Sequence, residues 1–103
     1  MISFSKTDNA NNIIAYVNCY LEADNKTFHI LEAWTEEPYQ GKGYFKAILS
    51  DIIAYCKKNS YTQITLTAAQ LSNISNNELV EIYKKCGFIS SECNKYRMYL
   101  NIT

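Results

Sequence analysis

The sequence contains few of the residues that shape unusual backbone or bind metals. Its 103 residues include three glycines, one proline and one histidine. Four cysteines are present, but no two of them have the C-x-x-C spacing of a metal or redox site. One histidine cannot complete a Cys/His zinc site among scattered cysteines, so we expect no metal. We interpret Cys19, Cys56, Cys86 and Cys93 as reduced core or surface thiols.

An excess of charge is also lacking, because ten basic residues balance ten acidic ones. This balance gives no electrostatic argument for a nucleic-acid or membrane partner. No apolar run is long enough to cross a bilayer, and the amino terminus has no charged-then-apolar signal pattern. We therefore expect a cytoplasmic protein.

What the sequence does have is ample material for a core. Hydrophobic residues make up 48% of the chain and aromatic residues 14%. That content excludes a disordered chain, and the length suits one domain over residues 1–103.

The first third of the chain has the pattern of three strands. The segments 2–5, 13–22 and 27–35 are rich in β-branched and aromatic residues and are separated by polar turns. Apolar residues then fall at helical spacing, which predicts a helix over 43–58. Residues 61–68 alternate again and predict a strand. The strand–helix–strand order requires a parallel pair.

A second helix is marked by Ser75 and Glu78, which have the capping-box spacing, and by Gly87 as its stop. Leu79, Ile82, Tyr83 and Cys86 would line one face of this helix. Residues 88–90 and 95–102 finish as strands. The prediction is an α/β fold with a mixed sheet of about six strands and two helices, in the order strand, strand, strand, helix, strand, helix, strand and a final strand.

The stretch PYQGKGYFKAIL places two glycines directly before the first helix. It fails the G-x-G-x-x-G dinucleotide fingerprint, because Lys46 stands at the third glycine, and it is not a P-loop. The remaining choices are a plain strand-to-helix turn and a turn whose amides bind a diphosphate at the helix start.

Two motifs resemble those of the GNAT family of N-acetyltransferases. Gln40, Gly43 and Phe45 occupy the fixed positions of the acyl-CoA motif Q/R-x-x-G-x-G/A, although Phe45 replaces a Gly or Ala. NNELVEIYKKCGF is similar to the second motif through Asn76, Tyr83, Gly87 and Phe88, with Leu79 in place of a small residue. The chain resembles a minimal member without the usual amino-terminal strand and two helices.

The resemblance implies an acyl-CoA-binding fold that uses acetyl-CoA as co-substrate. It leaves two environments for Phe45, whose ring could turn into the core or crowd the pyrophosphate. The Trp34 side chain is expected to be an ordinary core or interface aromatic, and Asn76 to contact the pantetheine or help to cap its helix. The cofactor-binding residues that the resemblance implies are Ala33, Trp34, Thr35, Gln40, Gly41, Lys42, Gly43, Tyr44, Phe45, Lys46 and Asn76.

The resemblance also makes Tyr83 the candidate general acid, since its ordinary pKa of about 10 keeps it protonated at neutral pH. His29 and Glu32 are the candidate bases, and their spacing predicts that they project from opposite faces of one strand.

The function predicted is direct transfer of an acetyl group to an amine, with a protein lysine or terminal amine as the favoured acceptor. A second subunit could complete the acceptor site, which would make the protein a homodimer. The alternative is a GNAT-like acyl-CoA-binding or protein-interaction module without catalysis.

Overall fold

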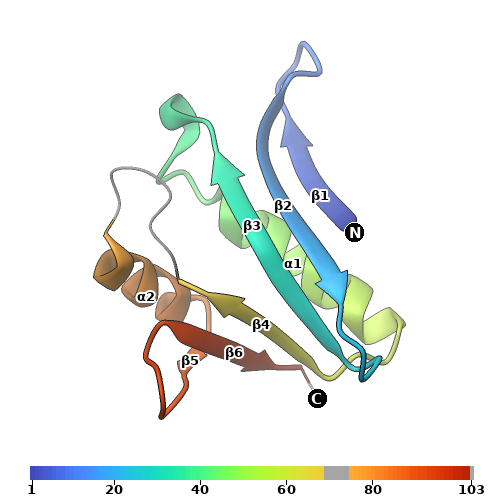
Figure 1. Ribbon diagram of the computed structural model, residues 1–103. Helices are drawn as coiled ribbons and strands as arrows, with labels where there is room; N and C mark the ends of the chain where they lie inside the picture. The colour runs from blue at the N-terminus through green and yellow to red at the C-terminus, as the bar shows by residue number, and fades with distance from the viewer. Residues whose placement is uncertain (69–74, 103) are drawn as a thin grey trace.

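The structure is a computed structural model that describes residues 1–68 and 75–102 (Figure 1). Its elements are β1 (Ile2–Thr7), β2 (Ile13–Leu21), β3 (Thr27–Thr35), a 3-10 turn η1 (Glu37–Tyr39), α1 (Tyr44–Lys58), β4 (Gln63–Thr67), α2 (Asn76–Lys85), β5 (Ile89–Ser90) and β6 (Arg97–Asn101).

These strands form one sheet in the order β1-β2-β3-β4-β6-β5. The pair β3–β4 is parallel and every other neighbouring pair is antiparallel. The predicted parallel pair joined through a helix is confirmed, the first three strands form an antiparallel meander, and the last two strands pair antiparallel.

Element boundaries differ from the prediction by a few residues. The first strand continues to Thr7, and the strand over 27–35 has the predicted limits. The first helix begins at Tyr44 because Gly43, with φ of 87°, is its N-cap. The short 3-10 turn over Glu37–Tyr39 was not predicted.

Both helices pack on one face of the sheet and share one core with it. Ile52 and Cys56 of α1 are fully buried, as are Phe28 of β3 and Ile64 of β4. In α2, Leu79, Ile82, Tyr83 and Cys86 share one face, as predicted. Ile82 is 41% exposed at the edge of this face, and Val80 is buried in the core beside it.

The ends of α2 follow the sequence signals closely. The Ser75 hydroxyl accepts a hydrogen bond from the Glu78 backbone N–H at 3.2 Å, which satisfies one free donor of the first turn. The Ser75 hydroxyl also donates to the Glu78 carboxylate at 3.3 Å. Gly87 follows the helix with φ of +103°, a conformation that glycine adopts without strain.

The four cysteines are free thiols. Burial raises the pKa of Cys19 to about 12 and that of Cys56 to about 11. Cys93 is exposed and Cys86 is half-buried. The two core thiols are therefore unreactive in the folded protein.

Neither helix in the described part of the chain is long and apolar enough to span a membrane.

We expect Ile52→Val to lower the free energy of unfolding by about 0.5–1.5 kcal/mol, because it removes a methylene group from a fully buried position. Urea denaturation followed by circular dichroism measures this change. The matched control is Ile13→Val, at a position that is 53% exposed, where the change should be near zero. Equal effects at both positions would contradict the burial pattern.

Candidate functional site

The site is organised by a β-bulge in β3. Asn18 of β2 pairs with Glu32, whereas the next residue, Cys19, pairs with Ile30. Leu31 is therefore an extra residue on β3 with no partner of its own. Bulges of this kind bend the strand and increase its twist.

The parallel ladder between β3 and β4 stops at the bulge. Its last pair is Ile30 with Leu66, although β3 continues to Thr35. Figure 1 shows the two strands diverging in a V from the end at which they are paired. Within the described residues, the carboxyl-terminal half of β3 thus has a strand neighbour on the β2 side only.

The bulge also changes which side chains share a face. His29 pairs with Tyr20 and Glu32 pairs with Asn18, and these two β2 residues lie two positions apart on one face. His29 and Glu32 therefore project from the same face. The prediction from their spacing was wrong, because an extra residue in the strand resets the alternation.

Backbone groups of β3 beyond the bulge point into the V. The Glu36 N–H donates to the Ile14 carbonyl at 2.8 Å, so the backbone of Glu36 faces β2. Because pairing alternates along an antiparallel strand, the backbone groups of Ala33 and Thr35 face the open side. The Gln40 side-chain N–H donates to the Thr35 carbonyl at 3.0 Å from that side.

The glycine turn leads from the V into α1. Gly41 and Gly43 have φ of +75° and +87°, which side-chain-bearing residues adopt only with strain. A Cβ atom built on either glycine would meet no protein atom within 4 Å. The glycines are thus required by the backbone conformation, and the space beside them is open.

The first turn of α1 offers free amides at this space. The earliest helical bond runs from the Ala47 N–H to the Gly43 carbonyl at 3.0 Å. The amides of Tyr44, Phe45 and Lys46 have no acceptor among the described residues. Unpartnered amides at the positive end of a helix favour an anion.

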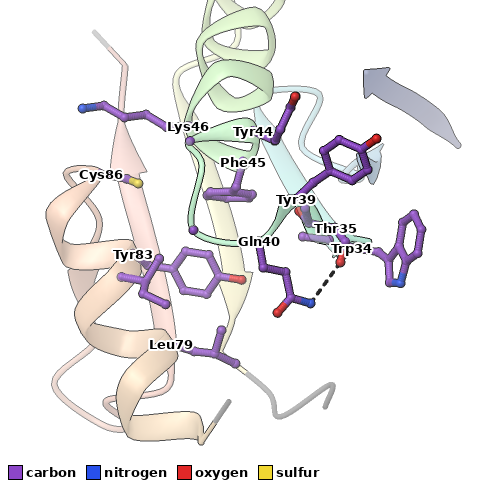
Figure 2. A pocket seen from close by; sticks show the side chains of 14 residues that line it. Trp34, Thr35, Tyr39, Gln40, Tyr44, Phe45, Lys46, Leu79, Tyr83 and Cys86 are labelled. Carbon is purple, nitrogen blue, oxygen red and sulfur yellow. Dashed lines mark hydrogen bonds between the residues drawn. The ribbon is translucent and has the colours of Figure 1, made fainter. Parts of the chain in front are cut away.

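A cavity of about 400 Å³ joins the V to this helix start (Figure 2). It is lined by the end of β3, the glycine turn, the start of α1 and one face of α2. Its lining residues are Ala33, Trp34, Thr35, Tyr39, Gln40, Gly41, Gly43, Tyr44, Phe45, Lys46, Leu79, Ile82, Tyr83 and Cys86.

The cavity brings together ten of the predicted site residues, from Ala33 in β3 to Tyr83 in α2. Lys42, Asn76, His29 and Glu32 are not among its lining residues. Because Ser75 caps α2, the side chain of Asn76 is not needed for that role. Its Oδ1 is buried and has no hydrogen-bond partner in the part of the chain that the structure describes.

Phe45 and Tyr83 meet across the cavity. Their ring centroids lie 5.3 Å apart in an edge-to-face arrangement. Phe45 is half-buried against the core, so its ring lines the cavity without closing it. Tyr83 is 8% exposed, and Figure 2 shows its hydroxyl directed into the cavity toward Gln40. Burial raises the pKa of Tyr83 above its ordinary value, which keeps the phenol protonated.

Four lining residues were not predicted as site residues, namely Tyr39, Leu79, Ile82 and Cys86. The last three were predicted to share a helix face with Tyr83, and that shared face is the signal that could have assigned them to the site. Burial raises the pKa of the Cys86 thiol, while the nearby Lys46 charge acts in the opposite direction.

His29 lies on the other face of the sheet. Its Nδ1 is 2.8 Å from the Thr65 hydroxyl, and its ring lies 5.2 Å from that of Tyr20. Burial lowers the pKa of His29, partly opposed by the charge of Glu22, so the imidazole is neutral at pH 7.

Two further predicted residues lie on the same face as His29. Trp34 is 41% exposed and stacks on Tyr16, with ring centroids 5.4 Å apart. Glu32 accepts a hydrogen bond from Asn18 at 3.1 Å. Over residues 1–68 and 75–102, no three His, Cys, Asp or Glu side chains gather closely enough to hold a metal ion.

Comparison with known proteins agrees with this geometry. The sequence profile described as the acetyltransferase (GNAT) family matches residues 3–88. The structure is similar to a GNAT-family acetyltransferase from Staphylococcus aureus Mu50, with 17% identity and a TM-score of 0.81 over 98% of this chain and 67% of that one. No curated protein matches the sequence.

Two other solved structures have the same fold. Tetrahymena GCN5 is 12% identical with a TM-score of 0.77, over 98% of this chain and 68% of that one. The Escherichia coli GNAT family N-acetyltransferase YhbS, solved in complex with CoA, is 11% identical with a TM-score of 0.76, over 98% of this chain and 58% of that one. The chain thus spans about three-fifths to two-thirds of these proteins, and the predicted mixed α/β fold is confirmed.

We expect Gly43→Ala to lower the free energy of unfolding by about 1–2 kcal/mol, because alanine is strained at this positive φ even though its Cβ has room. Gly43→Asn should lower it by less, since asparagine tolerates the left-handed region. Urea denaturation of the two variants tests this order. An alanine variant as stable as the parent chain would show that the turn does not hold this conformation.

Proposed function

The chain belongs to the acetyltransferase (GNAT) family, and we propose that it transfers an acetyl group from acetyl-CoA directly to an amine. The observation that carries the proposal is the single cavity that joins the free amides of α1 to the backbone of β3 beyond its bulge. A long donor with an anionic end and a reactive end suits such a cavity. The CoA complex of YhbS, which has the same fold, supports this donor.

The glycine turn and the start of α1 would hold the diphosphate. The amides of Tyr44, Phe45 and Lys46 are unpartnered within the described residues, and all three residues line the same cavity. The open space beside Gly41 and Gly43 allows a phosphate to approach the backbone closely. Of the two alternatives for this turn, these features favour a diphosphate-binding turn over a plain connection between strand and helix.

The open half of β3 would align the reactive end. Bound acetyl-CoA supplies a thioester whose carbonyl carbon accepts the amine nitrogen. The backbone groups of Ala33 and Thr35 face the V, where an N–H can stabilise negative charge on the carbonyl oxygen. Gln40 holds the Thr35 carbonyl and so fixes the end of this strand against the turn.

Tyr83 would act as the general acid. Its hydroxyl is directed into the cavity and its raised pKa keeps the proton available for the departing thiolate. His29, neutral because of its lowered pKa, is the base that we propose for the amine proton, acting through water from the opposite face. The amine would then approach from the sheet face that neither α1 nor α2 covers, which suits a protein lysine or terminal amine.

Acetyl-CoA should raise the midpoint of thermal unfolding, since about a hundredfold excess over Kd stabilises a folded chain by about 2.7 kcal/mol. Gly43→Ala should reduce this shift, because the added Cβ occupies the space beside the free amides. Gly87→Ala is the matched control, with a similar positive φ outside the cavity. No shift at millimolar acetyl-CoA would refute the proposal, and a shift without thiol release on an amine panel would favour the non-catalytic acyl-CoA-binding module.

Tyr83→Phe should leave the acetyl-CoA shift intact and lower the rate of thiol release by about a hundredfold or more, the usual contribution of a general acid. Tyr61→Phe removes a hydroxyl from a half-buried ring that does not line the cavity, and its rate should match that of the parent chain. A Tyr83→Phe variant with an unchanged rate would exclude the acid role.

A further inference from the structure

We propose that a second cavity, on the sheet face opposite α1 and α2, binds a carboxylate or phosphate group carried by the acceptor amine. This inference rests on the proposed function, and it adds a chemical class to the acceptor. The cavity, called here the open-face cavity, has a volume of about 390 Å³. Its polar side chains are those of His29, Gln63, Thr65, Thr67, Ser91, Arg97 and Tyr99.

Strand alternation places these groups on the open face. Across β4 and β6, Thr65 pairs with Tyr99 and Thr67 pairs with Arg97. The residues between them, Leu66 and Met98, are buried in the core. The side chains of Thr65, Thr67, Arg97 and Tyr99 therefore lie on the sheet face away from the helices.

The charge of the open-face cavity favours an anion. Arg97 supplies its one formal charge, and the described lining residues include no Asp or Glu. No salt bridge to Arg97 exists among residues 1–68 and 75–102. A guanidinium group presents several N–H donors in a fixed fork that matches a carboxylate or phosphate. Hydroxyl donors beside it would satisfy the remaining oxygen atoms.

Its position connects this cavity to the transfer site. Leu66 and Thr67 line it at the point where β4 separates from β3, and His29 lines its other edge. Arg97 pairs with Thr67, the last residue of β4, so an anionic group bound by Arg97 would lie beside the opening of the V. The Glu32 carboxylate on the same face is turned to β2, where it accepts a hydrogen bond from Asn18.

The decisive experiment is a titration of inorganic phosphate, and separately acetate, into the 15N-labelled chain at low ionic strength without acetyl-CoA. We expect saturable shifts of the Thr65, Thr67 and Tyr99 amides. Arg97→Gln should weaken this binding by about tenfold or more, equivalent to about 1.4 kcal/mol. Lys95→Gln is the matched control. Lys95 lies two residues before Arg97, its side chain is exposed and it does not line the cavity, so this variant removes one positive charge without changing the site.

Shifts confined to residues 41–46 would report phosphate at the glycine turn and would overturn the inference if Thr65 and Thr67 did not respond. An Arg97→Gln variant that bound as tightly as the parent chain would also overturn it. Because this readout needs no turnover, it separates the open-face cavity from the proposed enzyme activity.

A second arm compares L-lysine with L-lysinamide as acceptors, which differ only in the carboxylate. We expect a lower KM for lysine, with the difference lost in Arg97→Gln and kept in Lys95→Gln. Equal KM values in the parent chain would overturn the acceptor assignment and leave a site for free anions. Anion binding without transfer to either amine would refute the proposed transferase while the cavity itself stood.

Discussion

The extra residue at Leu31 is the constraint on which the site depends. Without this extra residue, strand alternation would turn the backbone groups of Ala33 and Thr35 toward β2 instead of toward the V. The bulge ends that ladder after Ile30 and turns the backbone of Ala33 and Thr35 toward open space. The cavity, the glycine turn and the start of α1 are then arranged around the strand end that the bulge has released.

The bulge lies between two cavities, one on each face of the sheet. On the helix face, the free amides at the start of α1 and the phenol of Tyr83 surround a cavity that suits an anionic thioester donor. On the open face, His29 and Arg97 surround a second cavity that suits an acceptor. In the proposed transfer, the donor would bind on the helix face and the acceptor on the open face, with their reacting atoms held together at the V.

Most of the architecture could be predicted from local patterns. Strand alternation, the Ser75 cap and the stop at Gly87 each act within a few residues, so the sequence encodes them directly. The bulge could not be predicted, because residues 27–35 form an uninterrupted strand pattern and only the register against β2 reveals the extra residue. The prediction that His29 and Glu32 project from opposite faces of the strand was wrong for that reason. The place of Phe45 also depended on packing, since its ring position is set by Tyr83 on a distant helix.

The shortness of the parallel ladder has a consequence for how the chain opens. Four residue pairs alone connect the β1–β2–β3 unit to the β4–β6–β5 unit among the described strands, and each unit is continuous in sequence. Such contiguous units tend to open as cooperative blocks, and the short ladder between β3 and β4 is the seam between these two. Fluctuations along this seam would widen the V, so the element that builds the binding site would also govern how readily a substrate can enter it.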